Sequence, residues 1–284
     1  MKITAIAPWF GAKRNLAGRI VEAIGKHRAY WEPFCGSMAV LLGKPAATME
    51  TANDLHGDLI NLARCVAHEE TAVALYGRLS RHLMHEDLFH EAATHWRDAG
   101  HRPAGEGPDV DRAVDFFVCS WVGRNGVAGT SSYNQGFALR FTKNGGHAAT
   151  RFTSAVESIP AWHERLRAVT ILNRDGFELL ERIEDADGVA IYIDPPYLIK
   201  GAKYVHDFQA ADHERLAALL HRFRRTRVVV SYYDDPRLAE LYPGWRQDKI
   251  DVSKALVSGG ARTKNDVRAT EVLLINERQR GLFR

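Results

Sequence analysis

The sequence predicts an α/β fold in which a mainly parallel sheet is interrupted by an inserted segment of helices and loops. Apolar runs with strand character alternate with helical patterns at both ends of the chain, which is typical of a parallel sheet covered by helices on both faces. A length of 284 residues suits about two structural units. The alternation stops between residues 67 and 159, so we expect residues 1–66 and 160–284 to form one domain, with residues 67–159 inserted into it.

The first predicted strands lie near the N-terminus. The aromatic run at residues 29–34 is broken by a proline and followed by a glycine, which predicts a strand that ends in a tight loop. A short helix at residues 37–43 and a second strand at residues 46–53 follow. In residues 55–68, apolar side chains recur every three or four positions from Leu55 onward, which is the spacing of one helical face.

The alternation resumes in the last part of the chain. Residues 168–173, 188–194 and 226–233 are rich in β-branched and aromatic side chains and predict three further strands. Residues 177–183 and 212–223 have helical patterns and fall between these strands. Both ends of the chain are therefore expected to contribute to one sheet.

The inserted segment differs from the rest of the chain in its charge. Residues 69–96 predict two helices, residues 111–124 a third, and residues 125–152 an irregular loop or hairpin. No Asp or Glu occurs from Phe116 to Val156, in a chain that contains 35 acidic residues. Local Lys and Arg clusters bind polyanions by releasing counterions from phosphates, and neighbouring aromatic side chains can stack on bases. Against the alternative of a solvated basic loop, we predict nucleic-acid contacts at Arg124, Asn125, Tyr133, Asn134, Arg140, Lys143 and Arg151.

Composition excludes several classes of protein. The net charge of +3, with 45% hydrophobic and 26% charged residues, is that of an ordinary globular protein. The three cysteines lie far apart, which argues against a disulfide framework and against a cysteine-rich zinc module. No apolar run approaches the roughly 18 residues that a membrane span needs, and the N-terminus lacks a signal-peptide core. We expect a soluble, cytoplasmic protein with no membrane partner.

The strongest functional signal is the motif Asp194-Pro195-Pro196-Tyr197 at the end of a predicted strand. A carboxylate at the carboxyl end of a parallel strand lies where open α/β sheets bind ligands. Asp194 and the carbonyl of Pro195 can accept the two hydrogens of an exocyclic amino group, because proline supplies no competing N–H. The ring of Tyr197 offers a face on which a planar base can stack. These residues suit the attack of an amino nitrogen on an electrophilic methyl group.

Two further motifs offer ligand contacts. Residues 32–37, with the sequence Glu-Pro-Phe-Cys-Gly-Ser, predict a strand–glycine–helix turn that a ligand can approach closely. Asp54 follows Phe34 by about 20 residues, at the end of the next strand, where a carboxylate can accept from ribose hydroxyls. Near the N-terminus, Trp9 and Lys13 can contact a carboxylate and a flat or sulfonium-bearing ligand.

Together, these motifs resemble the Dam-like family of N6-adenine DNA methyltransferases, and the resemblance covers most of the chain. It implies a Rossmann-like seven-stranded sheet with S-adenosylmethionine as the methyl donor. It also implies that double-stranded DNA is the partner, that the target adenine is flipped out of the duplex, and that the insert recognises the DNA sequence. A restriction endonuclease is a further candidate partner. The matching stretches are residues 9–13, 32–36, 54, 173–177, 194–197, 231–233 and 268–273.

The resemblance also assigns roles to individual residues. The catalytic residues that it implies are Asp194, Pro195, Pro196 and Tyr197. The chain departs from the family pattern at Met38, where the family loop usually has a second glycine. Cofactor contacts are implied for Trp9, Lys13, Glu32, Phe34, Gly36, Asp54, Asp175, Phe177 and Asp194.

Other functions stay open on the sequence alone. The methyl acceptor could instead be N4 of cytosine, an RNA base or an amide, and Met38 also allows a DNA-binding protein with a vestigial methyltransferase fold. A nicotinamide-dependent oxidoreductase does not account for the Asp194 motif. Four histidines lie between residues 82 and 95, but we expect only His82 and His85 to share a helical face, so no metal is predicted.

Overall fold

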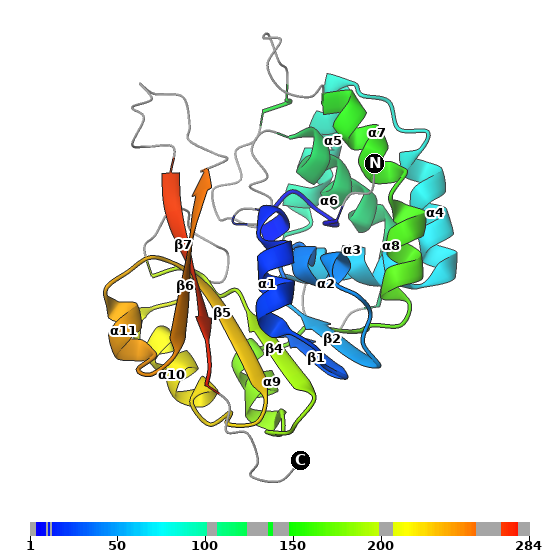
Figure 1. Ribbon diagram of the computed structural model, residues 1–284. Coiled ribbons are helices and arrows are strands. Elements are labelled where there is room, and N and C mark those ends of the chain that lie inside the picture. Colours follow the sequence, from blue (N-terminus) through cyan, green and yellow to red (C-terminus); the bar gives the residue numbers. More distant parts are fainter. Residues whose placement is uncertain are drawn as a thin grey trace.

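The computed structural model places a twisted seven-stranded sheet at the centre of the protein (Figure 1). It describes residues 4–9, 11, 13–100, 107–123, 136–138, 148–198, 207–253 and 268–277. The strand order is β3-β2-β1-β4-β5-β7-β6. The strands are β1 (Ala29–Glu32), β2 (Met49–Asn53), β3 (Thr170–Leu172), β4 (Val189–Ile193), β5 (Arg227–Tyr233), β6 (Arg246–Ser253) and β7 (Arg268–Ile275).

Strands β1 to β5 run parallel, whereas β7 is antiparallel to both β5 and β6. Ala29 of β1 pairs with Met49 of β2 on one side and with Val189 of β4 on the other. From β1 the chain continues outward to β2, and from β4 it continues in the opposite direction to β5. The strand order therefore reverses between β1 and β4, which is where open α/β sheets place their ligands.

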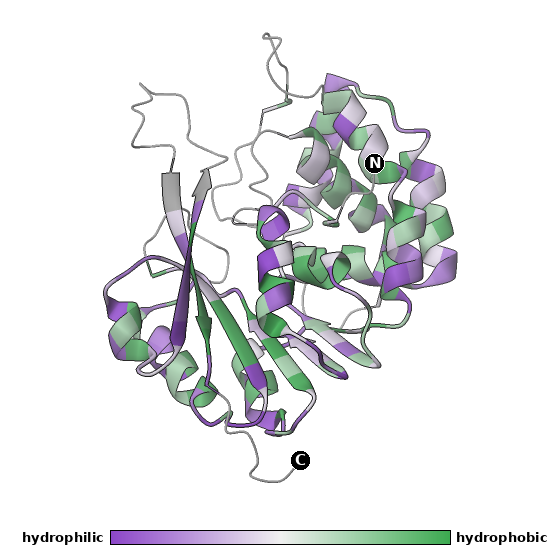
Figure 2. Ribbon diagram, in the orientation of Figure 1, coloured by the Kyte–Doolittle hydropathy of each residue, from purple (hydrophilic) through white to green (hydrophobic). Residues whose placement is uncertain are grey.

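Helices cover both faces of the sheet, as the alternation of side chains along β4 requires. Ala190 and Tyr192 point into one apolar cluster, and Ile191 and Ile193 into the other. Figure 2 shows the apolar colouring concentrated on the central strands and on the helix surfaces that face them. The first face carries η1 (Lys13–Asn15), α1 (Ala17–Ile24), α2 (Ala39–Gly43), α3 (Gly57–Ala67) and the helices beyond α3, while α9 (Gly176–Arg182), α10 (Ala210–Leu220) and α11 (Arg237–Leu241) cover the second.

The middle of the chain forms a helical group that packs on α3. Phe116 and Phe117 belong to the same apolar cluster as Tyr192 of the sheet, so this group shares a core with the sheet. An ion pair also connects the helical group to the sheet, because the guanidinium of Arg165 pairs with the buried carboxylate of Glu50 on β2. The helices are α4 (Glu69–Leu79), α5 (Glu86–Asp98), α6 (Val110–Val122), α7 (Ala148–Val156) and α8 (Ile159–Leu166).

The predicted strands and helices at both ends of the chain are present, but three local expectations are wrong. Leu55 is not on a helical face: α3 begins at Gly57, and Leu55 is 40% exposed. His82 and His85 do not share a helical face either, because α4 ends at Leu79 and His85 is the N-cap of α5. The predicted loop at residues 125–152 ends earlier than expected, since α7 occupies its last residues.

The described residues show neither a membrane span nor a cluster of metal ligands. None of their helices is both long enough and apolar enough to cross a bilayer. No three His, Cys, Asp or Glu side chains among them are arranged to hold a metal ion. Cys35, Cys65 and Cys119 are buried free thiols.

Candidate active site

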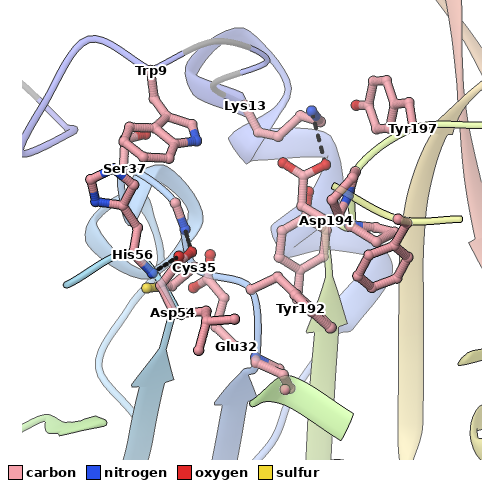
Figure 3. A pocket seen from close by; sticks show the side chains of 18 of the residues that line it. Trp9, Lys13, Glu32, Cys35, Ser37, Asp54, His56, Tyr192, Asp194 and Tyr197 are labelled. Carbon is pink, nitrogen blue, oxygen red and sulfur yellow. Dashed lines mark hydrogen bonds and ion pairs between the residues drawn. The ribbon is translucent and has the colours of Figure 1, made fainter. Parts of the chain in front are cut away.

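A cavity of about 320 Å³ opens at the carboxyl ends of β1, β2 and β4. Figure 3 shows Trp9, Asp54 and His56 on one side of it and Lys13, Asp194 and Tyr197 on the other. All the residues for which the sequence predicted catalysis or cofactor contacts line this single cavity. It therefore brings together motifs from residue 9 to residue 197, as the reversal of strand order between β1 and β4 requires.

Asp194 follows directly after β4 and is held through one of its two carboxylate oxygens. The hydroxyl of Ser231, on neighbouring β5, donates to Oδ1 at 2.9 Å, and Nζ of Lys13 lies 3.0 Å from the same atom. Within the described ranges, no residue donates a hydrogen bond to Oδ2. The carboxylate is thus oriented by two donors and keeps one oxygen for a ligand.

Lys13 is buried, whereas a lysine near a chain terminus is usually solvated. Its Nζ donates to the carbonyl of Gly11 at 2.6 Å and lies 4.8 Å from the centre of the Tyr197 ring. Burial by itself lowers the pKa of this amine, but the carboxylates of Asp194 and Glu271 outweigh burial and raise the pKa above its ordinary value. Lys13 is therefore a cation at neutral pH in the wall of the cavity.

Tyr197 is fixed at both ends of its ring. Its hydroxyl donates to the two carboxylate oxygens of Glu271 at 3.2 and 3.0 Å, and its ring meets that of Tyr233 edge-on with 4.5 Å between centres. Burial, with the nearby Asp194 and Glu271 carboxylates, raises the pKa of Tyr197 well above its usual value, so the phenol keeps its proton.

The glycine loop is organised around Asp54. The backbone N–H of Gly36 donates to Oδ2 of Asp54, and the N–H of His56 donates to Oδ1, each at 2.9 Å. Gly36 has a φ of 44°, and a Cβ at this position would lie 3.2 Å from the Trp9 indole. Glycine is therefore needed here both for the backbone conformation and for the close approach of the ring.

Met38 adopts the backbone conformation that a glycine would take without strain. Its φ of 59° and ψ of 28° are left-handed, at the N-cap of α2. Such a conformation is uncommon for a residue with a Cβ, and it accounts for the second glycine of the family loop at this position. The side chain of Met38 is fully buried, so its packing offsets the strain of this backbone conformation.

Three phenylalanines form one end of the cavity. The rings of Phe177 and Phe208 stack with 5.4 Å between centres, and Phe34 meets Phe208 edge-on at 5.6 Å. Gly176 lets Phe34 approach, because a Cβ on Gly176 would lie 2.6 Å from the ring. Asp175 caps α9 by accepting from the N–H of Phe177 at 2.7 Å. An aromatic cluster of this kind can take up a flat heterocycle.

Glu32 lies at the end of β1 and is 2% exposed. Its carboxyl accepts a hydrogen bond from the hydroxyl of Tyr30 at 2.9 Å. Burial, assisted by the negative charge of Asp194, raises the pKa of Glu32 to about 8. The group is therefore mostly protonated at neutral pH, and a cation bound in the cavity would favour its ionised form.

Several residues of this site have no role in the sequence-based interpretation, among them Phe208, Ser231 and Glu271. The last two lie in stretches that weakly match the family, residues 231–233 and 268–273, so a signal was present without an assigned role. Phe208 lies outside every matching stretch. Its part in the site depends on the packing of residues 34, 177 and 208, which are remote in sequence.

The predicted DNA contacts fall mostly outside the described residues. Six of them are not among the described residues, and their roles stay predictions: Arg124, Asn125, Tyr133, Asn134, Arg140 and Lys143. Arg151 is described, on α7, and does not line the cavity.

A model of the D12 class N6 adenine-specific DNA methyltransferase family matches residues 9–258. The chain belongs to this family. This confirms the resemblance read from the motifs, and with it the Rossmann-like methyltransferase fold indicated by the strand order. The matched residues include every residue that lines the cavity.

Solved structures give more distant similarities. A crystal structure of SMU.472, described as a methyltransferase complexed with SAH, matches at 10% identity and a TM-score of 0.28 over 59% of this chain and 46% of that one. A mutant of MtNAS matches at 16% identity and a TM-score of 0.22 over 46% of this chain and 40% of the other. This chain thus spans less than half of either solved protein. No curated protein matches the sequence.

Proposed function

We propose that this protein transfers a methyl group from S-adenosylmethionine to the N6 amino nitrogen of an adenine in duplex DNA. The observation that carries the proposal is the carboxylate of Asp194, which is held through Oδ1 and lines the same cavity as Tyr197 and Asp54. Membership of a family named for this reaction supports the acceptor.

The cavity suits a nucleoside with a cationic tail. Its aromatic end, formed by Phe34, Phe177 and Phe208, fits a purine ring, and the carboxylate of Asp54 can accept from ribose hydroxyls. Asp194 supplies negative potential for the charged part of the ligand, and Glu32 adds to it once a bound cation favours its ionised form. When bound, S-adenosylmethionine supplies an electrophilic methyl group on sulfur.

Asp194 and Tyr197 suit the acceptor base. Oδ2 of Asp194 and the carbonyl of Pro195 accept the two N6 hydrogens, and the Tyr197 ring stacks on the purine. With S-adenosylmethionine bound, the N6 lone pair would form the new N–C bond as the methyl–sulfur bond breaks, and Asp194 or water would accept the proton that the nitrogen then loses. Alignment of nitrogen, methyl and sulfur supplies much of the acceleration.

The base reaches this cavity only after leaving the duplex. Unstacking and unpairing cost a few kcal/mol, which contacts in the pocket offset. We propose that the segment of residues 67–159 holds the DNA, with the basic side chains between Arg124 and Arg151 binding the phosphates.

The test is transfer of label from methyl-labelled S-adenosylmethionine to DNA from a bacterial strain that lacks adenine methylation. We expect label with wild type, and a loss of at least a hundredfold with Asp194→Ala or Asp194→Asn. Undiminished transfer by either variant would exclude Asp194 from the reaction.

Digestion of the labelled DNA to nucleosides separates the acceptors by mass spectrometry. N6-methyladenine is expected, and N4-methylcytosine alone would transfer the assignment to cytosine. Calorimetry with S-adenosylmethionine addresses the vestigial alternative, which predicts no binding at millimolar cofactor. Cofactor binding is supported by Met38, which adopts the left-handed backbone that a glycine would adopt at this position.

A further inference from the structure

Glu271 contacts Lys13 and Tyr197, which line the cavity with Asp194, although the reaction as described above does not use it. It lies on β7, beyond β5 in the order β4-β5-β7, and its side chain is 6% exposed. Its carboxylate accepts the phenol hydrogen of Tyr197, and its Oε1 lies 3.9 Å from Nζ of Lys13. A buried carboxylate is costly unless it is paired, so a carboxylate at this position calls for a physical reason.

The charges around Asp194 supply that reason. Lys13 is one cation between two carboxylates, at 3.0 Å from Asp194 and 3.9 Å from Glu271. With Lys13 and Asp194 alone, the pair would be neutral. Asp194 would then do little to stabilise the positive charge that develops on the amino nitrogen as the N–C bond forms. With Glu271 as a second counter-ion, the group of three keeps one negative charge.

The geometry agrees with this charge balance. Lys13 and Ser231 both contact Oδ1 of Asp194, which leaves Oδ2 for the amino group. On its other side, the ammonium of Lys13 lies 3.9 Å from Oε1 of Glu271 on β7. The same carboxylate fixes the phenol of Tyr197, so one side chain sets both the ring that supports the base and the cation that faces Asp194.

We propose that Glu271 is a positioning residue of the methyl-transfer site: it is the counter-ion of Lys13 and the anchor of Tyr197, and it thereby leaves Asp194 negatively charged with one free oxygen for the acceptor amino group. The inference rests on the proposed function, because it assigns the amino group to Asp194. Glu271 acts through Lys13 and Tyr197 and does not itself touch the base.

Two substitutions separate the charge of Glu271 from its shape. Glu271→Gln keeps the shape and an oxygen that accepts from Tyr197, but it removes the charge; Glu271→Asp keeps the charge and shortens the side chain. Single-turnover methyl transfer to unmethylated bacterial DNA should fall about tenfold in Glu271→Gln and by less than about threefold in Glu271→Asp. The affinity for S-adenosylmethionine, measured by calorimetry, should stay within about twofold in both. Asp251→Asn, an exposed carboxylate on β6, is the matched control and should transfer at the wild-type rate.

A double-mutant cycle tests the link to Lys13. In a Lys13→Met background there is no ammonium to compensate, so adding Glu271→Gln should change the transfer rate by less than about twofold. Equal losses of transfer rate on adding Glu271→Gln to wild type and to Lys13→Met would overturn the proposal. So would a Glu271→Gln protein that transfers methyl groups as fast as wild type, or faster than Glu271→Asp. A Glu271→Gln protein that no longer binds S-adenosylmethionine would also overturn it. If wild type itself transfers no label to DNA, the proposed function fails, and that result is distinct from any pattern among the variants.

Discussion

The hydroxyl of Ser231 on β5 donates to Oδ1 of Asp194, which follows the end of the neighbouring strand β4, at 2.9 Å. The same hydroxyl oxygen lies 2.9 Å from the phenol oxygen of Tyr192, so the serine is held in place from the sheet side. The orientation of the motif carboxylate is therefore set by a neighbouring strand as well as by its own loop. Its other oxygen faces the cavity as a result.

Replacement of Ser231 by alanine should slow methyl transfer. A hydrogen bond to a charged group contributes about 1.5–3 kcal/mol, so loss of this donor should reduce the single-turnover rate by roughly ten- to a hundredfold. Ser158→Ala is the control, because that buried serine donates to the carbonyl of Ser154 at 2.7 Å, within the helical group. The control should lose a similar amount of stability in urea and keep the wild-type rate. Equal rates for the two variants would contradict the role given to Ser231.

Gly176→Ala should weaken cofactor binding and lower stability. The new Cβ would lie 2.6 Å from the Phe34 ring, and overpacking of this kind costs about 1–3 kcal/mol. Gly77→Ala in α4 is the matched control, because its Cβ would meet nothing within 4 Å. The control should gain up to about 1 kcal/mol from helix propensity. Urea unfolding and calorimetry with S-adenosylmethionine measure both effects, and an unperturbed Gly176→Ala protein would show that Phe34 moves freely.

Met38→Gly should be less stable than wild type, although glycine suits the left-handed backbone. Relief of the strain gains about 1–2 kcal/mol, whereas loss of a large buried side chain costs about 2–5 kcal/mol. Met38→Leu keeps the volume and should lose less than about 1.5 kcal/mol. The midpoints of urea unfolding rank the three proteins, and a Met38→Gly protein more stable than wild type would show that strain outweighs packing.

Glu32 should make stability fall as pH rises. The pKa of its carboxyl is about 8 in the folded protein, against 4.5 as the ordinary value, with burial as the main cause. Between these pH values the folded state holds a proton that the unfolded state has lost, so wild type should lose stability relative to Glu32→Gln from pH 4.5 to pH 8. Above pH 8 the difference should stay constant. Parallel stability curves for the two proteins would mean that Glu32 is ionised when folded.

The sequence predicted the parts of the site that are local. In the sequence, Asp194 and the loop from Glu32 to Gly36 each follow an apolar run that ends in a turn. Parallel strands bring such turns to the same edge of the sheet. The same reasoning failed at Leu55, where apolar spacing continued past the true start of α3. Periodicity identifies a helix better than it identifies the first residue of that helix.

The remaining parts depend on contacts between distant strands. Ser231 and Glu271 come close to Asp194 and Lys13 only because β5 lies beside β4 and β7 lies beside β5. No local pattern reveals that the antiparallel strand β7 is placed next to the parallel strand β5. Their burial is equally non-local: Lys13 reads as a solvated terminal lysine until two carboxylates are placed beside it. The missed residues are therefore those whose role comes from a neighbour far away in the chain.

Long-read detection of modified bases in a host without adenine methylation tests the central claim most directly. Cells that express the wild-type chain should carry N6-methyladenine at one recurring DNA word, and cells that express Asp194→Asn should carry none. Adenines that stay unmodified with well-expressed wild-type protein, or modification of cytosine in their place, would contradict the account.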